Sequence, residues 1–100
     1  MDEEALPLRE RLNLETARIQ WRELERYFAG GKVIQVSTEL DLIDVAVCFA
    51  EDQVQSLKAW MAAQQVHLLP DETAKTWAEQ LPDNLWAVVV APWVLVQARA

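Results

Sequence analysis

The feature that most constrains the fold is the apolar run 85–96, close to the end of the chain. It reads Leu-Trp-Ala-Val-Val-Val-Ala-Pro-Trp-Val-Leu-Val, and its β-branched residues favour a strand over a helix. Both alternate faces of such a strand are apolar, so we expect it to be covered on both sides. The run is too short to cross a bilayer as a helix, which needs about 20 residues.

Pro92 interrupts this run and leaves two readings open. A proline has no N–H for a sheet ladder, so it belongs at an edge, a bulge or a turn. The run is then either one long strand bent at Ala91-Pro92 or two short strands folded back around it. We favour the bent strand, because neither glycine nor asparagine accompanies Pro92 to make a tight hairpin turn.

Length and charge limit the class of protein. A chain of 100 residues suits one small domain, 1–100, in which the charged segment 1–12 can fray. The formal net charge of −7 disfavours partners whose recognition rests on basic residues, so we expect no nucleic acid and no anionic membrane surface. The N-terminus lacks the pattern of a signal peptide, so we expect a cytoplasmic protein.

The first half of the chain predicts one helix, followed by strands. From an N-cap at Asn13, apolar residues recur with helical spacing up to Ala29, and Gly30-Gly31 ends the helix. Its polar side mixes Arg11, Arg18, Arg22 and Arg26 with glutamates, and we expect pairs such as Arg11 with Glu15 and Glu23 with Arg26 rather than an anion site.

Segment 32–37 reads as a strand, whereas segment 40–50 is ambiguous. Ile43, Val45, Val47 and Phe49 alternate with smaller or polar residues, which favours a strand. Thr38-x-x-Asp41 instead resembles a helix-capping arrangement, which favours a helix. Of the two, we predict the strand.

The second half predicts a helix over 53–64, a strand over 66–69 and a helix that begins at Asp71. We expect Val54, Leu57 and Met61 to face inward in the first helix, and Ala74, Trp77 and Ala78 in the second. The predicted order is helix, strand, strand, helix, strand, helix, strand. This order predicts an α+β fold with one mixed sheet and helices packed mainly on one face.

Candidate site residues are few. Glu15, Asp41, Asp44 and His67 are the polar groups available for a pocket between helices and sheet, and acidic residues over 41–52 raise the question of a hard cation. One histidine and one cysteine are too few for a zinc site, and Cys48 has an apolar context that predicts a buried structural residue. We assign no catalytic residue, no metal and no cofactor.

Two tryptophans in the C-terminal run indicate a protein–protein interface. On a single unbent strand, Trp86 and Trp93 point to opposite faces, so one of them faces away from the helices. A bare apolar face requires a cover, and a second copy of the chain is the simplest one. Trp86, Pro92 and Trp93 are therefore candidate interface residues.

The chain also resembles a known family. The segments 12–17 (Leu-Asn-Leu-Glu-Thr-Ala) and 40–42, with Trp21, Trp60 and the ending Pro-Trp-Val-Leu-Val-Gln at 92–97, are similar to short uncharacterised proteins of proteobacteria and cyanobacteria that share a domain of unknown function. This resemblance implies a bacterial cytoplasmic protein. It implies no activity, cofactor or catalytic residue.

Two functions fit these observations. The first is a non-catalytic protein-interaction or regulatory module that forms a homodimer through the C-terminal strand or binds another protein. The second is a small-ligand or metal-ion binder, or a minor enzyme, that uses the polar pocket. We favour the first, because the sequence contains apolar surface in excess and no catalytic motif.

Overall fold

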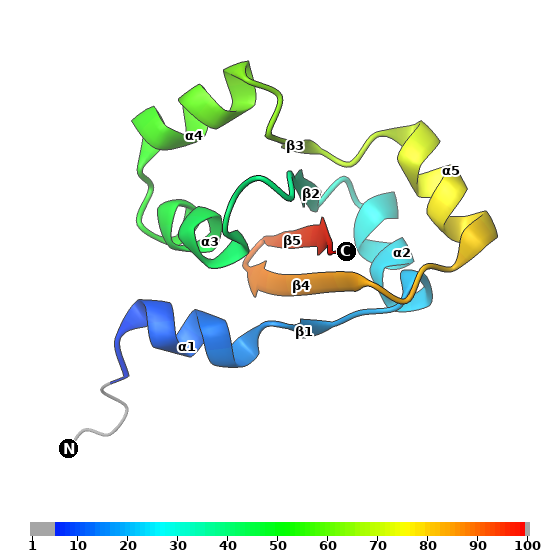
Figure 1. Ribbon diagram of the computed structural model, residues 1–100, viewed down its shortest axis with the longest axis horizontal. Coiled ribbons are helices and arrows are strands. Elements are labelled where there is room, and N and C mark those ends of the chain that lie inside the picture. Colours follow the sequence, from blue (N-terminus) through cyan, green and yellow to red (C-terminus); the bar gives the residue numbers. More distant parts are fainter. Residues whose placement is uncertain (1–5, 100) are drawn as a thin grey trace.

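The protein, described by a computed structural model over residues 6–99, is built on one five-stranded sheet. The α+β class predicted from the sequence is confirmed (Figure 1). The helices are α1 (Leu8–Glu15), α2 (Trp21–Ala29), α3 (Leu42–Ala50), α4 (Val54–Ala62) and α5 (Asp71–Gln80). The strands are β1 (Ala17–Arg18), β2 (Val33–Val36), β3 (Val66–Leu68), β4 (Leu85–Val90) and β5 (Trp93–Ala98).

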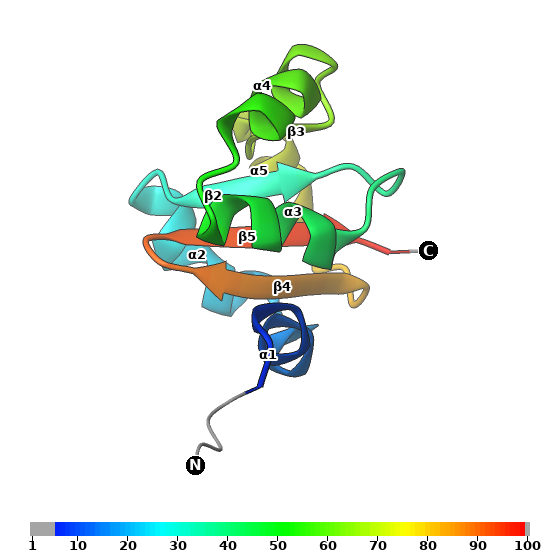
Figure 2. The same ribbon diagram turned by 90° about the vertical axis from the view of Figure 1, so that its left-hand side faces the viewer.

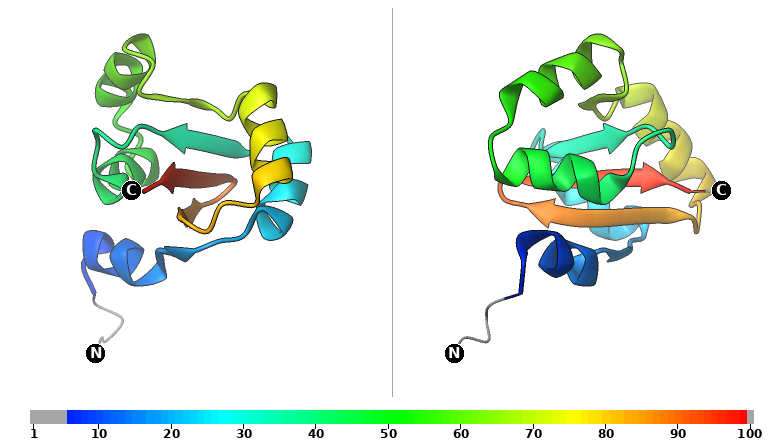
Figure 3. Two further views of the ribbon diagram at one scale, coloured as in Figure 1. Left: turned by 45° about the vertical axis from the view of Figure 1, so that its right-hand side comes forward. Right: turned by 60° about the vertical axis from the view of Figure 1, so that its left-hand side comes forward.

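The sheet has the strand order β1-β4-β5-β2-β3 and is mixed, as predicted. β2 runs parallel to β5, and the other neighbours are antiparallel. Figures 2 and 3 show α1 beside the β1 edge of the sheet and α4 beside the β3 edge. No helix within residues 6–99 is long and apolar enough to span a membrane.

The C-terminal apolar run forms the hairpin β4–β5, so the prediction of one bent strand is wrong. Leu85 pairs with Ala98 at the open end and Val90 pairs with Trp93 beside the turn. Pro92 lies in that turn, where its missing N–H removes no bond from the ladder. The second reading, two short strands folded back around the proline, is the correct one.

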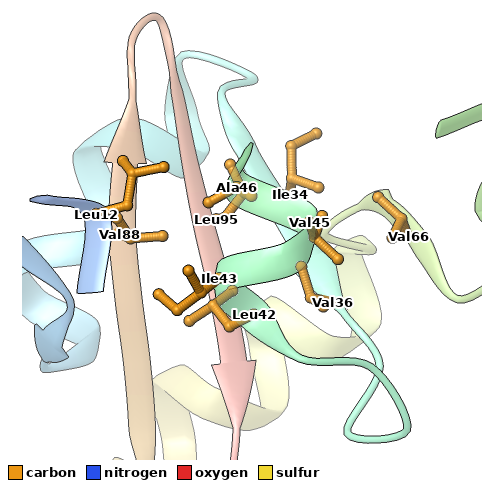
Figure 4. Packing of buried hydrophobic residues seen from close by; sticks show 10 residues of the cluster. All are labelled: Leu12, Ile34, Val36, Leu42, Ile43, Val45, Ala46, Val66, Val88 and Leu95. Carbon is orange, nitrogen blue, oxygen red and sulfur yellow. The ribbon is translucent and has the colours of Figure 1, made fainter. Parts of the chain in front are cut away.

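Helices cover both faces of the sheet rather than mainly one. α3 lies in front of β2, β5 and β4 in Figure 2, and α2 and α5 lie behind them. Neighbouring strand residues therefore enter different cores, because side chains alternate along a strand. The first cluster (Figure 4) contains Leu12, Ile34, Val36, Leu42, Ile43, Val45, Ala46, Val66, Val88 and Leu95. The second contains Trp21, Leu24, Val33, Leu69, Ala74, Trp77, Leu85, Ala87, Val94 and Val96.

Segment 40–50 contains helix α3, so the strand prediction for it is wrong. Asp41 is the N-cap, and its carboxylate accepts hydrogen bonds from the backbone N–H groups of Ile43 (2.8 Å) and Asp44 (3.4 Å). Leu42, Ile43, Val45 and Ala46 are all buried, with the one- and three-residue steps of a helix face. The alternation misled because Val47 and Phe49, off the centre of that face, are also large and apolar.

The single helix predicted to reach from Asn13 to Ala29 is instead two helices joined by β1. Asn13 lies inside α1, and the chain leaves the helix at Thr16 to pair with β4. A capping box, in which Gln20 and Glu23 bond each other's backbone N–H groups, then starts α2. The predicted end at Ala29 is confirmed.

The N-terminal segment is ordered where the structure describes it. α1 begins at Leu8, and Leu12 is buried in the first cluster. Residues 1–5 of the segment predicted to fray lie outside the described residues.

α4 and α5 lie close to their predicted positions but differ in burial. Ala74 and Trp77 are buried as expected, whereas Ala78 is exposed. The inward orientation predicted for α4 is wrong for Val54 and Met61, which are about half exposed, because α4 lies beside the sheet edge rather than over a face.

A buried glutamine joins the sheet to the loop before α3. The Gln97 side chain is 4% exposed, and its Nε2 donates to the carbonyl oxygens of Ser37 and Leu40, both at 2.8 Å. Its Oε1 accepts from Nε of Arg99 at 3.1 Å. Every polar atom of this buried amide is therefore paired, and the loop is held against β5.

We expect Gln97→Ala to destabilise the fold by about 2 kcal/mol, because the carbonyl groups of Ser37 and Leu40 both lose the Nε2 donor, and only that of Ser37 keeps the backbone N–H of Leu40. Urea unfolding followed by circular dichroism measures this change. Gln55→Ala, on the exposed side of α4, is the control and should stay within about 0.5 kcal/mol of the parent. Equal stability of both variants would contradict the role given to Gln97.

We expect Asp41→Ala to cost about 1 kcal/mol through loss of the α3 cap. Thr38, the other polar residue of the capping pattern in the sequence, is exposed in the turn before the helix. Thr38→Ala should therefore change the unfolding free energy by less than about 0.5 kcal/mol. The reverse ranking in urea melts would show that Asp41 is not the working cap.

Candidate functional site

The candidate interface residues Trp86 and Trp93 lie on the same face of the sheet. The hairpin reverses the chain between them, and both partly buried rings pack against the first cluster. The guanidinium of Arg99 lies over the Trp86 ring at 4.9 Å from its centroid. Pro92 is exposed in the turn. The expectation that one tryptophan faces away from the helices is therefore wrong, and α2 and α5 pack against the face expected to be bare.

The structure does not bring the four candidate polar residues together. Glu15 ends α1 beside β1, whereas His67 lies on β3 at the opposite edge of the sheet. Asp41 caps α3, and Asp44 accepts a hydrogen bond from Nη2 of Arg9 at 2.6 Å. Nδ1 of His67 is 3.0 Å from the carbonyl oxygen of Leu68. Among residues 6–99, no three His, Cys, Asp or Glu side chains gather as metal ligands.

Cys48 is buried in α3, as the sequence predicted. Burial raises the pKa of its thiol, because an apolar surrounding disfavours the thiolate. Its Sγ lies 3.8 Å from Oε1 of Gln53. A thiol with a raised pKa is a weak nucleophile, so Cys48 has the properties of a structural residue.

The most distinctive concave surface is a groove between β1, α2 and the β4–β5 hairpin, which we call the Arg groove. Its volume is about 520 Å³. Ala87, Val89 and Val94 form an apolar floor on the face of the sheet that carries α2. Figure 3 shows how the chain passes from β1 into α2 beside this hairpin. Val89 is 55% exposed, which is high for a valine inside a sheet.

Three arginines line the groove above this floor. Arg18 comes from β1, and Arg22 and Arg26 come from successive turns of α2. Nη1 of Arg18 donates to the carbonyl oxygen of Asp83 at 3.1 Å. The Arg26 guanidinium lies 5.1 Å from the centroid of the Tyr27 ring. Both contacts orient a guanidinium, and the partner in each is an uncharged group.

The ion pairs predicted for these arginines do not form. Within residues 6–99 the single ion pair is Arg9 with Asp44, so Arg11–Glu15 and Glu23–Arg26 are wrong. Glu23 instead accepts a hydrogen bond from the backbone N–H of Gln20 at 3.1 Å, because it completes the cap of α2. In the described part of the chain, the arginines of the groove therefore have no carboxylate within 4.0 Å.

A second hollow between α1 and the start of α3, of about 440 Å³, is a weaker candidate. Its arginine, Arg9, already bonds Asp44, and Asp41 is committed to the helix cap. The Arg groove is the stronger candidate, because its arginines form no ion pair within residues 6–99 and are available to bind an anionic group.

Sequence reasoning missed this groove for two reasons. Arg18 was placed on the same helix as Arg22 and Arg26, whereas β1 separates it from them. Val89 was placed inside a bent strand covered on both sides, whereas it lies near the hairpin turn, where α2 leaves it open. Pro92 was the signal in the sequence that could have revealed this surface. It allows 85–96 to form two strands, which places Val89 next to the turn between them.

The family profile described as "Protein of unknown function (DUF2288)" matches residues 7–98. The chain is also similar to a solved protein, the NMR solution structure of PA1075 from Pseudomonas aeruginosa. The two sequences are 42% identical, the TM-score is 0.81, and the match covers 100% of this chain and 92% of the other. No curated protein matches the chain significantly.

Proposed function

The chain belongs to the DUF2288 family of proteins of unknown function, and we propose that it is a non-catalytic protein-interaction module whose partner binds in the Arg groove. We place this activity in the bacterial cytoplasm. The proposed interface lies on the face of the β4–β5 hairpin opposite to Trp86 and Trp93.

One observation carries the proposal: arginines that form no ion pair within residues 6–99 lie beside an exposed apolar floor. Arginine and tyrosine are enriched among residues that contribute most to binding at protein interfaces. Arg22, Arg26 and Tyr27 provide these residues next to Val89, which is half exposed. An apolar centre with a charged rim is the usual anatomy of such a surface.

The groove is also built on regular structure. Arg22 and Arg26 lie on a helix anchored by Trp21 and Leu24, which are buried in the second cluster. The floor residues belong to paired strands. A surface held in place before binding loses less conformational entropy when a partner arrives.

Co-purification from native cells tests this proposal with two variants that change the net charge equally. We expect a protein partner to be retained by the tagged parent and by Arg11→Glu, which alters an exposed arginine of α1 outside the groove. Arg22→Glu should reduce its recovery about tenfold, because it reverses a charge directly beside the apolar floor of the groove. Recovery that is equal for Arg11→Glu and Arg22→Glu would contradict the proposal, as would the absence of any partner.

The chain is also predicted to form a homodimer through the β4–β5 hairpin. Val89, Ala91 and Pro92 are exposed around the hairpin turn and provide apolar surface for a second copy of the chain. We expect light scattering to give twice the monomer mass at high protein concentration. Val89→Asp should restore the monomer, whereas Val54→Asp, at an equally exposed valine of α4, should not. A monomer at every concentration would contradict the homodimer.

A further inference from the structure

We propose that the Arg groove binds a short, extended acidic segment of a partner protein, with carboxylate side chains two residues apart and at least one apolar side chain. This inference rests on the proposed function and specifies the chemistry of the partner. It is drawn from the spacing of the arginines, their lack of carboxylate partners among the described residues, and the composition of the floor.

The spacing of Arg22 and Arg26 matches an extended chain. Residues four apart on a helix are separated by about 6 Å along its axis. Alternate side chains of an extended segment are separated by about 6.6 Å and point the same way. Two carboxylates at positions i and i+2 of the segment can therefore each meet one arginine of α2.

The chemistry of the side chains favours carboxylates. A guanidinium presents a planar set of donors that fits a carboxylate in two parallel hydrogen bonds. The Tyr27 ring supports the guanidinium of Arg26, at 5.1 Å, and restricts its position. Val89, with the floor around it, offers contact area for an apolar side chain of the same segment.

The overall charge of the chain limits how much of the partner can be acidic. With a formal net charge of −7, the protein repels an extensively acidic surface, while the groove attracts negative charge locally. A short acidic segment uses the local attraction and avoids most of the repulsion. Glu15 and Glu23 line the groove as well, so three arginines face two glutamates there. Glu15 opposes carboxylates bound near the end of α1, and Glu23 opposes those bound near the start of α2.

NMR titration of the labelled full chain with a blocked Ser-Glu-Leu-Glu-Leu-Gly peptide tests the proposal. We expect saturable shifts of backbone signals around Arg22, Arg26 and Val89, and none at His67 on the opposite edge. The matched peptide with both glutamates replaced by glutamine should bind at least about tenfold more weakly.

Variants separate binding from structural effects. Arg22→Glu should weaken peptide binding about tenfold, whereas Arg11→Glu should leave it within about twofold. Glu15→Gln should strengthen binding, which a merely structural role of Glu15 would not produce. Equal affinity for the glutamate and glutamine peptides, or shifts outside the groove, would overturn the proposal.

Two further probes test whether the groove binds phosphate groups rather than carboxylates. Equal or tighter binding of inorganic phosphate, or of a short single-stranded oligonucleotide, would overturn the peptide proposal and assign the groove to phosphate groups. If co-purification depends on Arg22 while the acidic peptide does not bind, the interaction module stands and this inference fails. If neither the recovery of the partner nor the affinity for the peptide changes in Arg22→Glu, both proposals fail.

Discussion

The pairing of β4 with β5 is the interaction on which the rest of the structure depends. These two strands are the longest in the sheet, and they provide the edges to which β1 and β2 attach. Their side chains enter both cores, since Val88 and Leu95 face α3 while Ala87 and Val94 face α2. The helices on either side therefore have a common support, and the Arg groove exists because the hairpin extends beyond the cover that α2 provides.

The positive charge of the arginines in the groove is a result of local folding, since the chain as a whole is acidic. Glu23 lines the groove, but its carboxylate accepts from the backbone N–H of Gln20 at the start of α2 and makes no ion pair with an arginine there. The same break in the chain places Arg18 on a strand, across from the arginines of the helix. A requirement of secondary structure thus leaves positive charge exposed on a chain with a formal net charge of −7.

The sequence predicted the α+β class, the strand at Val33–Val36, the helix end at Ala29 and the burial of Trp77, because each rests on a local pattern. It failed where distant residues decide the structure. Ala17 continues the helical spacing from Leu14, yet it is exposed, because pairing with β4 replaces the helix after Glu15. The groove was missed for the same reason, since it requires residues from β1, α2 and the hairpin to meet.

The sharing of β5 between two cores also has a consequence for motion. A fluctuation that lifts α3 exposes the first cluster and can leave the second intact, and one that lifts α5 does the opposite. Displacement of β5 breaks its pairing with both β4 and β2 and opens both clusters together. Openings at β5 are therefore close to global unfolding in free energy, whereas the helices can open separately at lower cost.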